Sequence, residues 1–490
     1  MPNDSVRPAW TQVRAQTVGL VLGPVLAVAM LALPPPEGLS PEGWRTAAVA
    51  VLMAVWWATE ALPLAATALL PIALFPLLSF APIADATAPY ANPLIYLVLG
   101  GFFLARAIER WGLHRRIALA IVHRIGSTPG ALLIGFMVAT ASMSAWISNT
   151  ATTIMMLPIA VAVVRVVMPE EGAEGHGFFA QSLLLSVAYA ASIGGLATLI
   201  GTPTNALVAA FAAQTFGLDI GLARWMLVGV PVSLAMLAAA WGVFALRLRG
   251  FVLDRDAAAA TLRTAYEALD PMSTAERRVA MIFAVTAVAW ITRPFIVDLF
   301  ALPLLTDAGI AMCSAIVLFL LPSGDVSRAR VLDWATARGV PFDILILFGG
   351  GLSLAAAIAD TGLAAWLGGT LGALDALPLL GLIAASVALV IFLTELTSNA
   401  ATTAAFLPII AALAVEFGVP PMLLAVPAGL AASCAFMLPV ATPPNAIVFG
   451  SGLVTIGQMV RMGFLLNLIG IAIVTTLGFA LAPLLGGVGN

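Results

Sequence analysis

Two short polar stretches inside apolar sequence carry the side chains best suited to binding an ion or a small acid. The first reads SNTATT at residues 148–153, and the second reads SNAATT at residues 398–403. Eight positions are identical over the aligned segments 148–160 and 398–410. Oxygen atoms of Ser, Thr and Asn suit a hard cation such as Na⁺, and hydroxyl, amide and free backbone N–H groups suit a carboxylate. Each stretch, which we call a tip, therefore has the chemistry to bind either kind of ion.

Two further motifs place proline within an apolar run. GTPTN occupies residues 201–205, and ATPPN occupies residues 441–445. Proline removes a backbone hydrogen-bond donor, so we expect each helix to unwind at its motif and to expose carbonyl oxygens. Neither tip contains Arg or Lys. An anion bound near the tips therefore needs its charge offset by bound cations and by the positive ends of helices.

The chain contains two related halves. GGFFLARAI at residues 100–108 aligns with GGLSLAAAI at residues 350–358, with the same offset of 250 residues as the two tips. Two separate blocks with one common offset are not expected by chance, even in an Ala-rich chain. A polar island that occurs twice inside apolar sequence is typical of a transporter built from two repeats.

The composition is that of a membrane protein. Of the 490 residues, 62% are hydrophobic and 9% are charged, and the mean hydropathy is +1.08. A soluble protein has about 25% charged residues, and many apolar runs here reach the roughly 20 residues that span a bilayer. The net charge of −3 and the absence of a basic cluster exclude nucleic acid as a partner.

We predict an all-α polytopic membrane protein with about 11 transmembrane helices and two re-entrant hairpins, arranged as two inverted repeats. The tip of each hairpin must be buried in protein or line a cavity, because irregular backbone is not tolerated against lipid. Each predicted repeat makes an odd number of crossings, so the second copy enters the membrane upside down. The predicted boundaries are an N-terminal helix and loop at 1–45, a first repeat at 46–246 with hairpin 130–168 and broken helix 178–214, a cytoplasmic linker at 247–278, and a second repeat at 279–490 with hairpin 376–415 and broken helix 421–457.

The distribution of arginine predicts the orientation. With a cytoplasmic N-terminus, this layout places most of the 21 basic residues at or near the inner surface. The exceptions are Arg45, Arg224 and Arg293. This bias follows the positive-inside rule. We expect an integral protein of a bacterial inner membrane with a cytoplasmic N-terminus.

Other chemistry is sparse. No His or Lys lies in a predicted span, so a Ser–His or Ser–Lys hydrolase is excluded, and we expect neither an enzyme nor a cofactor. Glu395 lies three residues before Ser398, inside the second predicted hairpin. An acid at this depth is a candidate for function. It could couple transport to protons, or it could be paired within the hairpin arm.

As a set, these motifs resemble those of the divalent anion/sodium symporter family, the INDY-type dicarboxylate transporters. The resemblance covers nearly the whole chain. It implies a homodimer in which each protomer has a scaffold domain and a mobile transport domain that holds the hairpins and the broken helices. It also implies elevator-type alternating access, with Na⁺-coupled import of C4-dicarboxylates such as succinate, malate or fumarate.

The resemblance also implies site residues. The first Na⁺ site would use Ser144, Ser148, Asn149 and the backbone of Gly201. The second would use Thr394, Thr397, Asn399 and the backbone of Ala441. The substrate carboxylates would contact Asn149, Thr150, Thr202, Pro203, Asn399, Thr442 and Pro443. Two positions depart from the family pattern, because Ala400 replaces a Thr in the second tip and Thr204 replaces a Pro that is common in the first break.

Other transport functions remain open at this point. The chain could be a Na⁺-independent dicarboxylate exchanger, a sulfate transporter or a tricarboxylate transporter of the same family. A cation/proton antiporter is a different class, and it would need a titratable acid at the tips. Only Glu395 lies near enough in sequence to serve.

Overall fold

The computed structural model describes residues 10–167, 176–248, 251, 253–324, 329–370 and 378–486. Within these ranges the fold is all helical, apart from one isolated bridge between Pro322 and Arg330, which confirms the predicted fold class. The predicted hairpin boundaries at 168 and 376, residues 1–9 and three linker positions (249, 250 and 252) lie outside the described residues.

The first half of the chain contains helices of very different length, several of them short. They are α1 (Trp10–Ala32), α2 (Pro41–Thr59), α3 (Leu64–Thr67), α4 (Leu70–Leu77), α5 (Ile83–Thr87), the 3₁₀ helix η1 (Ala88–Ala91), α6 (Pro93–Arg110), α7 (Leu113–Ile125), α8 (Pro129–Ser144), α9 (Asn149–Val167), α10 (His176–Gly195), α11 (Pro203–Phe216) and α12 (Leu222–Arg247).

The second half begins after one helix in the linker, α13 (Arg255–Glu267). It then continues with α14 (Thr274–Phe300), α15 (Asp307–Leu320), α16 (Trp334–Ala337), α17 (Phe342–Asp360), α18 (Leu363–Thr370), α19 (Leu379–Thr394), α20 (Asn399–Glu416), α21 (Met422–Ala431), α22 (Pro443–Phe449), α23 (Ile456–Leu481) and the 3₁₀ helix η3 (Ala482–Leu485).

The helix boundaries repeat the sequence offset. Helix α8 covers residues 129–144 and α19 covers residues 379–394, so both ends differ by 250. The next helices, α9 and α20, begin at Asn149 and Asn399, at the same offset. In each half a short non-helical turn therefore separates two helices at the Ser-Asn tip, in the stretch predicted as a hairpin.

Nine of the described helical segments are long and apolar enough to cross a membrane. Two of them, Asn149–Val166 and Asn399–Glu416, are second arms of the predicted hairpins. Five shorter apolar segments include the first hairpin arms, Pro129–Ser144 and Leu379–Thr394. Length alone does not decide whether a short segment crosses, so the count of 11 stays a prediction.

The two breaks lie upstream of the proline motifs. Helix α10 ends at Gly195 and α21 ends at Ala431, whereas Pro203 and Pro443 are the first residues of the helices that follow. A proline at the first helical position loses no intrahelical hydrogen bond, and its fixed φ favours the helix. The second break, at residues 432–442, is the longer one, and the ATPPN motif ends it instead of forming it.

Three helices lie where the sequence indicated only polar or linking segments. Helix α13 lies in the predicted linker, and Asp254 caps it by accepting hydrogen bonds from two backbone N–H groups. It packs against α7, which carries the basic residues that follow α6. Helix α18 occupies the corresponding position after α17.

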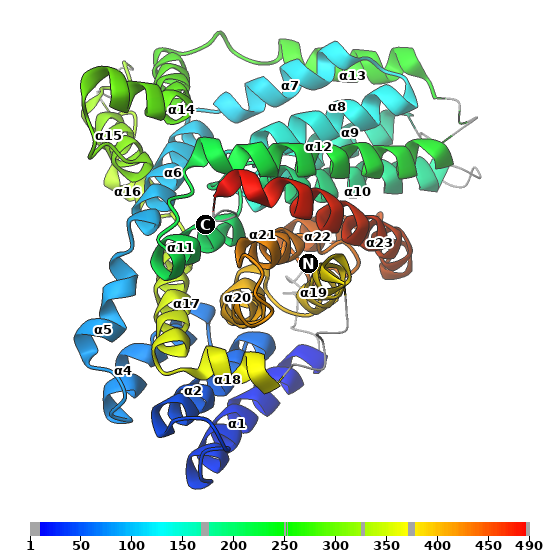
Figure 1. Ribbon diagram of the computed structural model, residues 1–490. Coiled ribbons are helices and arrows are strands. Elements are labelled where there is room, and N and C mark those ends of the chain that lie inside the picture. The colour runs from blue at the N-terminus through cyan, green and yellow to red at the C-terminus, as the bar shows by residue number, and fades with distance from the viewer. Residues whose placement is uncertain are drawn as a thin grey trace.

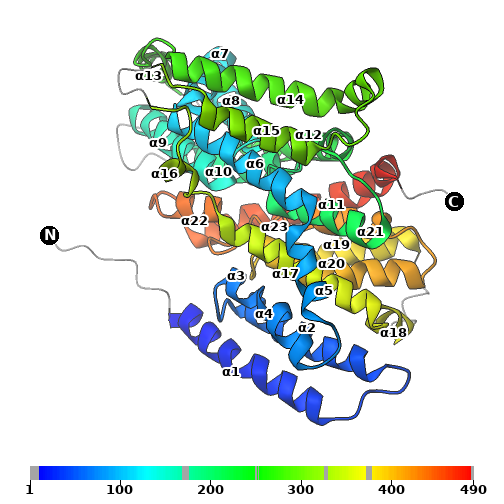
Figure 2. The same ribbon diagram turned by 90° about the vertical axis from the view of Figure 1, so that its left-hand side faces the viewer.

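The helices of the second hairpin and the second break lie in the middle of the molecule. In both ribbon views α14 lies at one end of the molecule and α1 with α2 at the other, while α19 to α23 lie between them (Figure 1, Figure 2). Helix α15 packs along α6, and α1 packs along α2.

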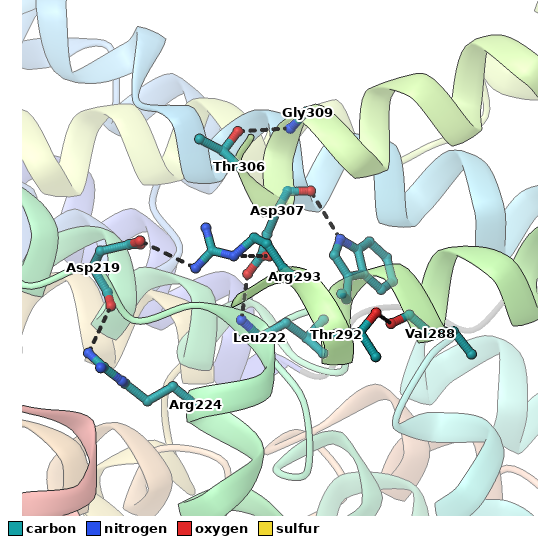
Figure 3. A network of polar contacts seen from close by, with 10 residues as sticks. Asp219, Leu222, Arg224, Val288, Thr292, Arg293, Thr306, Asp307 and Gly309 are labelled. Carbon is teal, nitrogen blue, oxygen red and sulfur yellow. Dashed lines mark hydrogen bonds and ion pairs between the residues drawn. The ribbon is translucent and has the colours of Figure 1, made fainter. Parts of the chain in front are cut away.

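A polar network joins the start of α12 to α14 and α15 (Figure 3). The guanidinium group of Arg293 lies 3.0 Å from Asp307 Oδ1 and 3.4 Å from Asp219 Oδ2. The other oxygen of Asp307 accepts a hydrogen bond from the backbone N–H of Leu222 at 2.7 Å. One carboxylate from α15 therefore caps the first turn of α12.

Candidate functional site

One cavity of about 480 Å³ brings together both tips and both breaks. Its polar wall comes from residues 148–150, 200–204, 398–400 and 439–444. The remaining wall is formed by helices outside the hairpins and breaks, and it includes Glu60, Leu64, Phe102, Pro341, Asp343, Ile344 and Leu347. Segments from opposite halves of the chain thus face a single space.

In the first half, three oxygens converge beside the tip. With its amide oriented to satisfy its hydrogen bonds, Asn149 Nδ2 donates to Ser144 Oγ at 2.6 Å and to the carbonyls of Gly201 and Ala191 at 3.2 and 3.3 Å. The Ser144 hydroxyl donates to the Ala191 carbonyl at 2.6 Å. A Cβ at Gly195 would lie 2.9 Å from the nearest atom of the Asn149 amide group, so only glycine leaves this amide its space. Oxygens that surround one polarised N–H₂ group can also surround Na⁺, so the donor set fits the predicted ion.

The second half repeats this arrangement. Thr394 Oγ1 donates to Asn399 Oδ1 and to the carbonyl of Ala432, both at 2.8 Å. Thr394 stands where Ser144 stands in the first half, and both hydroxyls are fully buried. Here a hydroxyl, an amide oxygen and a backbone carbonyl meet beside the tip, whereas the amide nitrogen faces the hydroxyl in the first half. The oxygens of this second set suit a hard cation.

The helices after the two breaks begin in nearly the same way. Thr202 has φ −144° and ψ 144°, and Thr442 has φ −144° and ψ 148°. Both are N-cap residues followed by a proline at the first helical position. The backbone therefore enters both helices in the same way, although the Thr442 hydroxyl caps α22 and the Thr202 hydroxyl does not cap α11.

Asn205 and Asn445, the last residues of the two proline motifs, brace the breaks. Asn205 Nδ2 donates to carbonyls 10 and 7 residues earlier, at 2.9 and 2.8 Å. Asn445 Nδ2 makes the same two contacts, 10 and 7 residues back, at 3.2 and 3.0 Å. Buried polar groups need such partners, and both asparagines are fully buried. The sequence presented both residues within the motifs without indicating this role.

All seven residues predicted to contact substrate line the cavity. Of the residues predicted to bind Na⁺, five also line it, namely Ser148, Asn149, Gly201, Asn399 and Ala441. Ser144 and Thr394 lie behind the tips, one hydrogen bond away from their asparagines. The Thr397 hydroxyl bonds the Leu393 carbonyl and the Thr402 hydroxyl instead.

Serine side chains at the tips contribute little to helix capping. Ser398 makes no side-chain capping hydrogen bond to α20. The Ser148 hydroxyl lies 3.5 Å from the backbone nitrogen of Ala151, at the limit of a hydrogen bond. Both hydroxyls therefore stay available at the cavity.

The charge of the cavity is unusual for an anion site. Glu60 and Asp343 are the charged side chains among its described lining residues, and no Arg, Lys or His is among them. Helices α9, α11 and α20 all begin at lining residues, so their positive ends face the cavity. Asp343 was not anticipated from the sequence.

Two further contacts hold the second break. Thr204 Oγ1, at the start of α11 in the first half, and Ser433 Oγ in the second break share a hydrogen bond of 2.7 Å. The Glu395 carboxylate accepts hydrogen bonds from backbone N–H groups of the second break and from Asn467. These partners lie outside the hairpin arm, so pairing of Glu395 within the arm, one of the two alternatives drawn from the sequence, does not occur.

Comparison with known proteins gives matches along almost the whole chain. The family model for the sodium:sulfate symporter transmembrane region matches residues 14–488. The sodium-dependent dicarboxylate transporter SdcS of Staphylococcus saprophyticus is 40% identical over 481 residues, which are 96% of this chain and 92% of that protein. SdcS of Staphylococcus aureus is 40% identical over 484 residues, with the same coverage.

Solved structures of similar fold are more distant in sequence. The YdaH transporter of Alcanivorax borkumensis has a TM-score of 0.55 at 15% identity, covering 96% of this chain and 97% of that one. MtrF of Neisseria gonorrhoeae has a TM-score of 0.53 at 12% identity, covering 97% and 95%. At these identities the likeness concerns the fold alone.

Proposed function

This chain belongs to the sodium:sulfate symporter family, and from that premise we propose that it is a Na⁺-coupled importer of C4-dicarboxylates such as succinate, malate or fumarate. The relatives that are 40% identical carry the name sodium-dependent dicarboxylate transporter. The protein is an integral membrane transporter, and we assign it no catalytic residue. Its coupling ion is Na⁺.

The composition of the cavity is the observation that carries this proposal. A dicarboxylate brings two negative charges into a space whose described lining has two carboxylates and no basic side chain. Helix ends each offset only part of a charge. Bound cations must supply the rest, so substrate binding and cation binding depend on each other. Coupling to Na⁺ follows from this dependence.

The proposed roles of the residues follow from their positions. One cation binds near Ser144, Ser148, Asn149 and Gly201, and the other near Thr394, Thr397, Asn399 and Ala441. The substrate carboxylates meet the tip and break residues at the cavity surface, namely Asn149, Thr150, Thr202, Pro203, Asn399, Thr442 and Pro443. In support, all seven of these line one space.

Uptake of labelled succinate into proteoliposomes tests the proposal. We expect accumulation with an inward Na⁺ gradient and little uptake when choline replaces Na⁺. Excess malate or fumarate should compete, and sulfate or citrate should not. Empty liposomes serve as the control for leakage.

Each alternative gives a different result in the same assay. A Na⁺-independent exchanger takes up succinate only when the vesicles are preloaded with a dicarboxylate, whatever the cation outside. Competition by sulfate or citrate that exceeds competition by malate would indicate the corresponding substrate class. Uptake driven by a proton gradient without Na⁺ would overturn the proposed coupling.

We further propose that the protein is a homodimer in a bacterial inner membrane and works by elevator-type movement of the hairpins and broken helices. Inverted repeats and a cytoplasmic N-terminus are part of this proposal. Cysteine labelling in intact cells should find positions near Arg116 and Arg255 on the cytoplasmic side and positions near Asp219 and Asp298 outside. Labelling of both sets from one side would contradict the inverted arrangement.

A further inference from the structure

Glu395 is a buried acid at the turn of the second hairpin, and its side chain is only 3% exposed. Its Oε1 accepts hydrogen bonds from the backbone N–H groups of Phe436 and Met437 at 2.7 and 2.9 Å and from Asn467 Nδ2 at 2.8 Å. Its Oε2 accepts from the N–H groups of Met437 and Leu438, both at 3.1 Å. Three successive residues of the second break thus point their N–H groups at one carboxylate.

In the first half, the corresponding backbone N–H groups find hydrogen-bond partners without a charged side chain. Asn205 and Asn445 bind carbonyls at matched distances along the chain, so residues 196–198 correspond to residues 436–438. The N–H groups of residues 196 and 197 bond to carbonyls three residues earlier, in a local turn. The Thr198 hydroxyl then donates to the carbonyl of Ala145, which occupies the place of Glu395 in the first hairpin.

This difference accompanies a longer second break. Helix α10 continues to Gly195, whereas α21 ends at Ala431, four residues short of the matched position. In the second half, the N–H groups of residues 436–438 bond to the carboxylate instead of to a local turn. Glu395 therefore replaces local turn bonds and ties the break directly to the hairpin.

The tied elements carry the second set of cation ligands. Thr394, the residue before Glu395, bonds both the tip amide of Asn399 and the Ala432 carbonyl at the start of the break. Ala441 lies near the end of the break, a few residues after the N–H groups that Glu395 binds. A shift of the break relative to the hairpin turn would separate these oxygens.

We propose that Glu395 is a positioning residue for the second cation site, holding the break against the hairpin so that its oxygens converge on one ion. The inference rests on the proposed Na⁺ coupling and concerns only its second site. Glu395 does not touch the ion or the substrate in this arrangement. Both its charge and its length are required, because three N–H groups and an amide must share two oxygens.

The experiment compares Na⁺ binding in purified Glu395→Gln, Glu395→Asp and wild-type protein. The primary readout is the rise in melting temperature as Na⁺ replaces choline at constant ionic strength, because an ion that binds only the folded state stabilises it. The second readout is the Na⁺ concentration at half-maximal succinate uptake. Glu416→Gln is the matched control, since it removes an exposed acid from the end of α20, in the same hairpin.

We expect Glu395→Gln and Glu395→Asp each to need roughly tenfold more Na⁺ for half of the melting shift, as for the loss of a hydrogen bond to a charged group. Maximal uptake at saturating Na⁺ should change much less. Glu416→Gln should behave as the wild type. The Gln variant loses the charge, and the Asp variant loses the reach to residues 436–438.

Three outcomes would overturn the inference. An unchanged Na⁺ requirement in either variant shows that charge or reach is unnecessary. A lower melting temperature in choline with an unchanged Na⁺ requirement shows a general structural role only. Absence of any Na⁺ effect in the wild type refutes the proposed coupling itself, and the inference then falls with it.

Discussion

The two hairpin tips share their backbone plan and differ in how each is fastened to the break beside it. Near the first tip, the hydrogen bond between hairpin and break joins two neutral groups, with the Thr198 hydroxyl donating to the Ala145 carbonyl. Near the second tip, the Glu395 carboxylate takes that place. The comparison shows that two different sets of hydrogen bonds can hold a hairpin tip against the break beside it.

The tips also differ in the groups that they present to the cavity. Thr150 offers a hydroxyl, and Ala400 offers a methyl group that is 9% exposed. The helix after the first break has Thr204, whose hydroxyl bonds Ser433 of the second break. The helix after the second break has Pro444 at the corresponding position, which offers no donor. The first half is thus richer in hydroxyl groups, and the second has the buried charge.

Replacing Asn149 or Asn399 by Ala should have the largest effect on uptake, and the two replacements should have similar effects. Each amide serves a proposed cation site and the substrate. Loss of a hydrogen bond to a charged group costs about 1.5–3 kcal/mol, so uptake should fall by roughly tenfold or more, with a higher Na⁺ requirement. Succinate uptake across a series of Na⁺ concentrations measures both changes. Unchanged Na⁺ dependence in both variants would contradict the assigned cation sites.

Gly195→Ala should affect the first cation site more than the second, because Ala435 already has a methyl group at the matched position in the second half. A Cβ at 195 meets the Asn149 amide at 2.9 Å and the Gly201 carbonyl at 3.1 Å. Overpacking of this kind costs about 1–3 kcal/mol, and it acts on the first cation site. Ala435→Gly is the control and should change the Na⁺ requirement much less. Equal effects on Na⁺-dependent uptake would remove this distinction between the sites.

Glu395→Ala combined with Leu438→Thr tests whether the two fastenings are interchangeable. The double variant copies the first half, with an Ala in the hairpin turn and a hydroxyl in the break. The new hydroxyl can restore one neutral hydrogen bond, worth about 0.5–1.5 kcal/mol. We expect a lower Na⁺ requirement than in Glu395→Ala alone, measured by the Na⁺-dependent melting shift. No improvement would mean that the second break needs the carboxylate specifically.

Ala400→Thr and Thr150→Ala should have the smallest effects, and in opposite directions. The first adds a possible hydrogen bond worth about 0.5–1.5 kcal/mol, and the second removes one. We expect Ala400→Thr to strengthen dicarboxylate binding modestly or to shift the ranking of C4 acids, without altering Na⁺ dependence. Competition with succinate, malate, citrate and sulfate measures the ranking. If neither variant changes it, substrate contacts lie at the Thr202 and Thr442 breaks instead.

The sequence was most informative where the chain repeats itself. The tips and the proline motifs could be recognised because each occurs twice, and the structure brings all four to one cavity. A Ser-Asn pair alone would also fit an ordinary helix cap. Repetition, more than residue type, therefore predicted the location of the candidate site.

The sequence was least informative where backbone atoms are the partners. The second break lies upstream of Pro443 and contains Pro439, yet α21 already ends at Ala431, well before either proline. Within this break Glu395 binds N–H groups 41 to 43 residues away, a contact that the pattern of side chains did not predict. The segment of helix α13 was predicted only as a linker, because its arginines made the short amphipathic pattern of the helix hard to recognise.

Asn467 has a consequence for the order in which the molecule is assembled. The hydrogen bonds that join the first tip to its break lie within residues 144–205, so they can form soon after that segment leaves the ribosome. The second half needs an amide from α23, 72 residues after the acid it binds. Its completion must wait for the last helix to be synthesised. A nascent chain that stops before α23 therefore has the hydrogen bonds of the first tip, while Glu395 still lacks its amide partner.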